Sequence, residues 1–163
     1  MNPLVIGVAD PRADDVQALL VRHLAFANEQ TPPEHVHALD LDGLLDPAVT
    51  FFSARRNGRL VAIAALKELD PAHGEVKSMH TAAEARGRGA GRAMLDRLIG
   101  VARQRGYRRV SLETGTMDAF APARALYANA GFEPCGPFAG YRPSLDNTFM
   151  TLDLSRRGEL TET

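Results

Sequence analysis

The chain has 163 residues, 45% of them hydrophobic and 24% charged, and its formal net charge is −1. This is the composition of a soluble globular protein that can bury a sizeable core, and a charge so close to zero excludes a basic surface for nucleic acid over the whole molecule. No stretch approaches the roughly 18 apolar residues of a membrane span, so we expect no membrane partner. One cysteine, Cys135, excludes an internal disulfide and a thiolate-rich zinc site.

The N-terminal residues lack the charged and then apolar pattern of a signal peptide. Together with the single cysteine, this predicts a cytoplasmic protein. We expect one domain over residues 1–155, followed by a polar C-terminal tail over residues 156–163.

Apolar periodicity predicts the elements of the first half of the chain. Asn57-Gly58 lies between two strand-like runs and indicates a tight hairpin. The expected elements are a strand at Leu4–Val8, a helix from Asp14 to the break at Thr31-Pro32-Pro33, a short helix or ordered loop at Glu34–Leu45, and an antiparallel meander of strands at Thr50–Arg56, Arg59–Leu69 and Glu75–Thr81.

The second half alternates between helix and strand. The expected elements are a helix at Gly91–Arg105, a strand at Tyr107–Thr114 with Val110 and Leu112 inward, a helix at Ala123–Ala130, and closing strands at Phe132–Phe138 and Asn147–Leu154. This order predicts an α/β (α+β) fold, in which a mixed central sheet has an antiparallel meander followed by parallel strands, with helices on both faces.

The most informative segment is Arg86-Gly87-Arg88-Gly89-Ala90-Gly91-Arg92, which joins a predicted strand to a predicted helix. Its glycines allow a tight turn whose backbone N–H groups point at a ligand. The helix N-terminus adds partial positive charge and unpaired donors, and three arginines flank these amides. The segment therefore predicts a pyrophosphate site. A dinucleotide fingerprint would need glycine at position 92, which is arginine.

These residues resemble the GCN5-related N-acetyltransferase (GNAT) family. Arg86, Gly89 and Gly91 match that family's pyrophosphate motif, and Leu126-Tyr127-x-x-x-Gly131-Phe132 matches a second motif at the right distance. One position departs from the pattern, since Phe120 stands where many relatives have Asn. A bacterial subgroup of small acetyltransferases is also similar over short runs, which include His37-Ala38-Leu39-Asp40, Ala65-Leu66-Lys67, Glu75-Val76-Lys77-Ser78-Met79, Leu112-Glu113-Thr114-Gly115 and Gly136-Pro137-Phe138.

The resemblance implies an N-acetyltransferase that uses acetyl-CoA, releases CoA and needs no metal. It also implies that the strand at 75–81 opens away from the strand at 107–114, with the pantetheine arm in the gap and an N–H near Met79–His80 at the developing oxyanion. The implied cofactor contacts are Met79, His80, Thr81, Arg86, Gly87, Arg88, Gly89, Ala90, Gly91 and Arg92.

Two residues carry the implied acid and base chemistry. Tyr127 is the candidate general acid, and its alternative role is that of a core tyrosine on the helix stripe. Glu75 is the candidate general base, and its alternative role is that of an exposed strand-end carboxylate beside Lys77. Glu113 and His80 remain open as other bases. Strict alternation along the strand would place His80 on the face opposite Glu75.

The acceptor is implied to be the primary amine of a small molecule, attacked directly in a ternary complex. His37 and Glu113 are the candidate acceptor contacts, and Cys135 is expected to be a small buried residue without a nucleophilic role. Relatives are often homodimers, so the resemblance implies a homodimer. Three alternatives stay open: a protein or peptide N-acetyltransferase, a CoA-binding sensor with little catalysis, and an interaction module that binds no CoA.

Overall fold

The computed structural model describes residues 3–31 and 39–155, which form a seven-stranded mixed sheet of order β1-β2-β3-β4-β5-β7-β6. The predicted mixed fold is confirmed, with most boundaries within two residues. The elements are β1 (Leu4–Val8), α1 (Asp14–Gln30), α2 (Leu41–Leu44), β2 (Val49–Arg56), β3 (Arg59–Asp70), β4 (His73–Thr81), α3 (Ala90–Gln104), β5 (Arg109–Gly115), α4 (Ala121–Asn129), β6 (Glu133–Cys135) and β7 (Asn147–Asp153).

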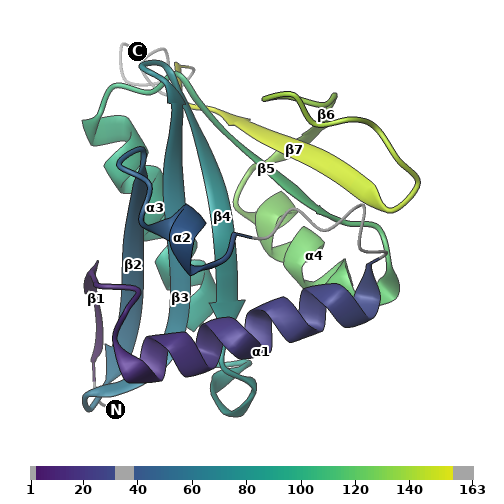
Figure 1. The fold of residues 1–163 in the computed structure, drawn as a ribbon. Coiled ribbons are helices and arrows are strands. Elements are labelled where there is room, and N and C mark those ends of the chain that lie inside the picture. Colours follow the sequence, from purple (N-terminus) through teal and green to yellow (C-terminus); the bar gives the residue numbers. More distant parts are fainter. Residues whose placement is uncertain (1–2, 32–38, 156–163) are drawn as a thin grey trace.

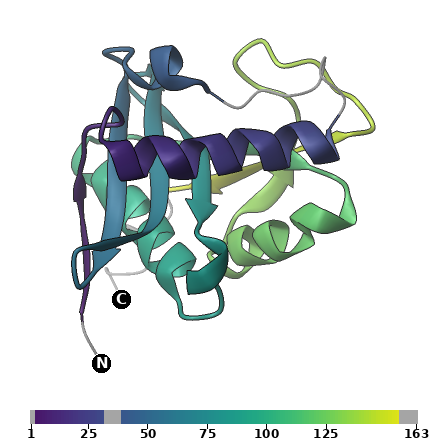
Figure 2. The same ribbon diagram turned by 60° about the horizontal axis from the view of Figure 1, so that its bottom comes forward.

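Helices cover both faces of the sheet. Helices α1 and α2 lie on one face, and α3 and α4 lie on the other (Figures 1 and 2). The buried stripe of α3 contains the residues expected from its periodicity, which are Met94, Leu95, Leu98, Ile99 and Ala102. None of the helices in the described part of the chain is long and apolar enough to cross a bilayer.

Two expectations need correction in their extent. The N-terminal antiparallel block of the sheet has four strands rather than three, since β1 also pairs with β2. The strand expected at Phe132–Phe138 is shorter, because β6 ends at Cys135, before Gly136 and a proline that has no N–H to donate. Within the segment expected at Glu34–Leu45, α2 occupies Leu41–Leu44, whereas His37 lies outside the described residues.

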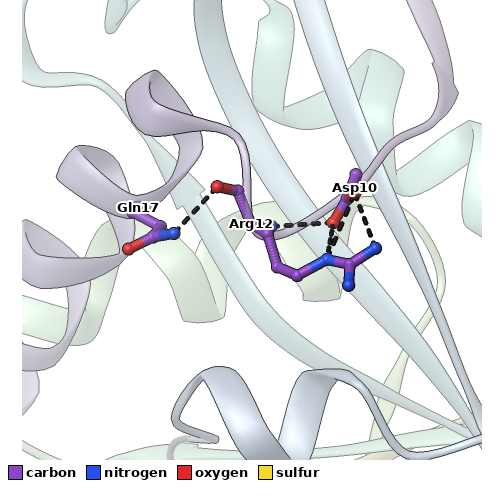
Figure 3. Close-up of polar contacts among 3 residues, drawn as sticks. All are labelled: Asp10, Arg12 and Gln17. Carbon is purple, nitrogen blue, oxygen red and sulfur yellow. Dashed lines mark hydrogen bonds and ion pairs between the residues drawn. The ribbon is translucent and has the colours of Figure 1, made fainter.

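Side chains rather than an N-cap organise the entry to α1. Ala13 occupies the cap position and has no side-chain acceptor. Instead, Asp10 accepts hydrogen bonds from the backbone and guanidinium of Arg12, and Gln17 Nε2 donates to the Arg12 carbonyl at 2.8 Å (Figure 3). These groups are exposed, so the ion pair adds little stability. Its consequence is geometric, since it fixes where α1 begins its path across β3 and β4.

Strands β4 and β5 are the only parallel pair among the described strands, and they separate along their length. Their register covers only His73↔Arg109, Gly74↔Val110 and Glu75↔Ser111, although β4 continues to Thr81 and β5 to Gly115. The implied opening of these strands is therefore confirmed. Beyond Glu75, the backbone groups of β4 that face β5 have no strand opposite them.

A chain of buried and part-buried hydrogen bonds closes the joined end of this pair. Thr151 Oγ1 donates to the Val110 carbonyl at 3.2 Å, so Ser111 Oγ donates to Thr151 at 2.9 Å and His73 Nε2 donates to Ser111 at 2.7 Å. Packing is also tight here, since a Cβ on Gly74 would meet the Tyr107 ring at 2.8 Å. The point at which the strands part is thus fixed by packing and by hydrogen bonds across β4, β5 and β7.

A β-bulge in β4 overturns the expected direction of His80. Lys77 pairs with Ala65 and His80 pairs with Ile63, so two residues of β4 oppose one residue of β3. Ser78 takes up the extra length with a left-handed backbone, φ 54°. Lys77 and His80 therefore share the face that also carries Glu75, and the prediction from strict alternation was wrong.

Candidate active site

A cavity of about 520 Å³ occupies the gap between the opened strands. It runs from the N-terminus of α3 to the point where β4 and β5 join, and most of the candidate site residues line it. These are Glu75, Met79, His80, Thr81, Arg86, Gly87, Gly89, Ala90, Gly91, Arg92, Glu113 and Tyr127. Arg88 is exposed and is not among the lining residues.

The glycine turn forms one end of the cavity. Gly87 and Gly89 have φ values of 78° and 84°, a left-handed conformation that glycine adopts without strain. Within the described chain, no backbone N–H between residues 87 and 92 donates to another group, and the first helical bond in this region runs from Ala93 to Gly89. Free donors, the helix dipole and the space next to Gly89 together suit an anion.

The arginines of this turn differ in their surroundings. Arg92 Nε bonds Asp96 Oδ1 at 3.0 Å, which offsets part of its charge. Arg86 faces His80, and its charge adds to the effect of burial on that imidazole. Backbone amides therefore provide the fixed part of the anion site, with Arg86 and Arg92 as the cations that line it.

Glu75 lies at the opposite end of the cavity, and the alternative of an exposed carboxylate is wrong because the residue is 2% exposed. Its Oε2 atom is 3.1 Å from Lys77 Nζ and accepts a hydrogen bond of 2.6 Å from the Tyr141 hydroxyl. The Lys77 ammonium also donates to Tyr141 at 2.6 Å. Burial by itself disfavours a carboxylate, whereas the ammonium and the phenol stabilise it.

Glu113, the rival carboxylate, projects from β5 into the same cavity but has a different neighbour. Asn147 Nδ2 donates to Glu113 Oε2 at 2.8 Å. Glu113 therefore accepts from a neutral amide, where Glu75 is paired with a cation.

Tyr127 is buried in α4, packs against Phe132 with ring centroids 6.0 Å apart, and also lines the cavity. Burial raises the pKa of its phenol to about 12. Its hydroxyl makes no hydrogen bond with any residue in the described ranges 3–31 and 39–155. The side chain is thus at once part of the core and a protonated group at the cavity wall.

His80 meets a second histidine from the helix above it. The Nδ1 atoms of His23, on α1, and His80 lie 3.3 Å apart, and Phe26 adds an aromatic neighbour. Burial lowers the pKa of both imidazoles to about 4, with mutual repulsion as a further cause for His23. Both rings are neutral near pH 7.

Phe120, at the position where the family resemblance implied an asparagine, also lines the cavity. Its ring stacks edge-on against Phe26 at 5.2 Å. A Cβ on Gly115 would meet this ring at 2.4 Å, so glycine at 115 makes room for it. The cavity wall is apolar here rather than amide-bearing.

Cys135 lies outside this cavity, in a second hollow near His73. The expectation of a buried residue was only partly right, because it is half-buried. Burial raises the pKa of its thiol, which keeps the sulfur protonated. Within the described residues, no three His, Cys, Asp or Glu side chains gather as a metal site.

Several side chains at the cavity were not foreseen from the sequence. Tyr141 and Asn147 reach Glu75 and Glu113 from a distant loop and strand, and no local pattern marks them. His23 and Phe26 line the cavity from α1, and nothing in the apolar pattern of that helix marks them.

An open mixed sheet, parted parallel strands and a glycine turn at a helix N-terminus are the features of an acyltransferase that receives a thioester between its strands. A model of the acetyltransferase (GNAT) family matches residues 16–132. The chain belongs to this family and is an N-acetyltransferase with an acetyl-CoA-binding fold.

Curated relatives support this assignment over most of the chain. The uncharacterized N-acetyltransferase YsnE of Bacillus subtilis (strain 168) is 44% identical over 149 residues, 91% of this chain and 99% of the relative. YedL of Escherichia coli (strain K12), also an uncharacterized N-acetyltransferase, is 43% identical and covers 89% of this chain and 91% of its own. A protein of Azospirillum brasilense named IAA acetyltransferase is 35% identical, over 92% of this chain and 97% of the relative.

Solved structures share the fold. A Klebsiella pneumoniae structure has a TM-score of 0.76 at 26% identity and covers 93% of this chain and 97% of its own. A Bacillus subtilis acetyltransferase in complex with CoA has a TM-score of 0.71 at 18% identity, covering 93% of this chain and 99% of its own.

Proposed function

We propose that this protein transfers the acetyl group of acetyl-CoA to the primary amine of a small molecule, by direct attack in a ternary complex. The observation that carries the proposal is the single cavity that joins free backbone N–H groups at one end to a buried carboxylate at the other. Such a cavity suits a long cosubstrate with an anionic part and a reactive end.

The residues of the glycine turn fit the pyrophosphate of CoA. The N–H groups of residues 87–92 would bind it, with Arg86 and Arg92 adding charge and Arg88 facing solvent. The unpaired edge of β4 at Met79 and Thr81 would pair with the pantetheine amides. An N–H near Met79–His80, next to the bulge, would stabilise the developing oxyanion.

Acetyl-CoA supplies a thioester carbonyl that is already activated, so the chain has to manage two protons. Glu75 would take one proton from the acceptor's ammonium and release it to solvent, which leaves a neutral amine. As the new C–N bond forms and the C–S bond breaks, Tyr127 would donate its proton to the departing sulfur. The surplus proton of the new amide nitrogen would restore Tyr127.

Direct attack is supported by the position of the chain's thiol. Cys135 lies outside the cavity, and burial raises its pKa, so no thiolate stands next to the acyl group. A small-molecule acceptor is supported by the subgroup resemblance and by the name of the Azospirillum brasilense relative. Glu113 and His37 are proposed as acceptor contacts.

The assembly and location of the protein also belong to this proposal. We place it in the cytoplasm as a homodimer, with residues 1–155 as one domain. Light scattering on the purified protein at micromolar concentration measures the mass, and a mass near 17.6 kDa would contradict the homodimer.

The function is tested in two steps with the purified protein. Calorimetry should detect binding of CoA and of acetyl-CoA, and thiol release from acetyl-CoA should rise with at least one amine of a broad panel. Glu75→Gln should bind CoA as the wild type does but lose turnover. Tight CoA binding without release for any amine would indicate a sensor, and no heat with CoA at millimolar concentration would overturn the assignment of the anion site.

A further inference from the structure

We propose that Lys77 and Tyr141 are positioning residues for Glu75, which hold its Oε2 atom and leave Oε1 as the atom that takes the acceptor's proton. The inference rests on the proposed function, because it assigns the proton transfer to one oxygen of that carboxylate. It brings in Tyr141, which lies outside the residues matched by the family model, and gives Lys77 a role.

The contacts form a closed triangle at the joined end of β4 and β5. Tyr141 donates its single hydroxyl proton to Glu75 Oε2 at 2.6 Å and accepts from Lys77 Nζ at 2.6 Å, and Lys77 lies 3.1 Å from the same Oε2. The Glu75 and Lys77 side chains are 3% and 9% exposed. Charge-assisted bonds this short between buried groups allow the carboxylate little rotation.

Only one oxygen of Glu75 is held in this way. Both contacts involve Oε2, and no residue in the described part of the chain hydrogen bonds with Oε1. Glu75 lines the cavity. Oε1 is therefore the oxygen that a water molecule or an amine in the cavity can approach.

Tyr141 acts as a donor because its phenol stays protonated. Burial and the charges of Glu75 and Glu113 raise the pKa of Tyr141. Its ring is held on the loop between β6 and β7 by Phe138 and Phe149, with centroids 5.3 and 5.8 Å away. The hydroxyl therefore reaches Glu75 from a braced position.

Other titratable groups surround the carboxylate and bear on its pH dependence. Lys67 lies opposite Glu75 in the register of β3 and β4, His73 lies two residues before it on β4, and Glu113 of β5 lines the same cavity. None of these makes the bonds to Oε2. Removing Lys77 or Tyr141 therefore changes the stabilisation of the carboxylate while these neighbours stay in place.

The test compares Tyr141→Phe and Lys77→Met with wild type in steady-state kinetics between pH 5.5 and 9.5. Loss of the phenol should lower kcat by about 10- to 100-fold and move the acid limb of the kcat/KM profile up by about one pH unit, since a donor to the charged form is lost. Lys77→Met should move the acid limb to a still higher pH, because it removes the cation that is paired with Glu75. KM for acetyl-CoA should be unchanged, because the anion site lies at the other end of the cavity.

Tyr107→Phe is the matched control. It also removes a phenol that donates to a carboxylate, Glu68 Oε1 at 2.8 Å, but neither residue lines the cavity. Its pH profile should follow wild type. A wild-type profile and kcat in Tyr141→Phe, with only a lower melting temperature, would show that the contact is merely structural and overturn the proposal.

A second measurement does not depend on turnover. In protein labelled with ¹³C-glutamate, the Glu75 carboxyl signal, assigned by its absence in Glu75→Gln, should titrate at a higher pH in Tyr141→Phe than in wild type. Identical titrations would overturn the positioning role. If wild type releases no thiol with any amine but the titrations differ, the proposed function is wrong, whereas the role of Lys77 and Tyr141 in holding Glu75 Oε2 is supported.

Discussion

Gly89 offers the sharpest test of the anion site, because a substitution there has two separable effects. Its positive φ affects the stability of the protein, and its place at the cavity affects cofactor binding. With φ at 84°, alanine at this position must adopt a left-handed conformation that costs about 1 kcal/mol. Nothing lies within 4 Å of the added Cβ, so no clash within the protein adds to this. Gly89→Ala should lower the melting temperature by about 2–4 °C for a chain of this size.

Cofactor binding should suffer more than stability. Gly89 lines the cavity beside the free N–H groups, so the new methyl occupies space that a phosphate needs. A hydrogen bond to a charged group is worth about 1.5–3 kcal/mol, and the loss of one such bond raises the Kd for CoA about 10- to 100-fold. Calorimetry with CoA measures this directly, and Gly89→Glu should abolish binding.

Gly58 provides the control for the free-energy cost of the left-handed backbone conformation. It has φ at 74°, has nothing within 4 Å of an added Cβ, and lies in the β2–β3 hairpin away from the cavity. Gly58→Ala should therefore show the same fall in melting temperature with an unchanged Kd. If both variants bind CoA equally well, the amides of this turn do not hold the pyrophosphate.

Three further substitutions or conditions separate catalysis from stability. Tyr127→Phe should lower kcat about 100-fold in the thiol-release assay, with little change in KM for acetyl-CoA. The melting temperature should also change little, because the hydroxyl makes no hydrogen bond in the described chain. An unchanged kcat would mean that Tyr127 has only a packing role. Ser78→Gly should raise the free energy of unfolding in urea by about 1 kcal/mol, since it relieves a φ of 54° and removes a buried hydroxyl without a partner in the described chain; a loss of stability would mean that this side chain supports the bulge. Burial holds the pKa values of His23 and His80 at about 4, below 6.5, so the unfolded state takes up protons first; stability should be complete above pH 6.5 and decline as the pH falls toward 4. Denaturation curves at several pH values measure this decline, which should be shallower in His23→Leu, and an equal slope would contradict the assignment.

The sequence predicted those parts of the fold that depend on local signals. Asn57-Gly58 defined the first hairpin, the glycine turn preceded α3 as expected, and the opened strands followed from the resemblance. These features are encoded within a few residues, where backbone preference and apolar periodicity leave few choices.

What the sequence missed depends on contacts between distant segments or on irregular backbone. Tyr141 reaches Glu75 across 66 positions, and a β-bulge carries no reliable pattern when a serine adopts the left-handed conformation. That one extra residue at Ser78 reversed the expected direction of His80. Residue type alone could therefore name three candidate bases but could not rank them.

The environments of those three candidates now argue for one of them. His80 is a weak base near neutral pH, since its pKa is about 4 and its Nδ1 atom is engaged with His23. Glu113 accepts a hydrogen bond from the neutral side-chain amide of Asn147. Glu75 stands at the last residue paired between β4 and β5, so the ladder fixes its backbone while its side chain faces the widening gap. A fixed backbone, an Oε2 atom held by Lys77 and Tyr141, and an Oε1 atom without a hydrogen bond in the described chain together favour Glu75 as the proton acceptor.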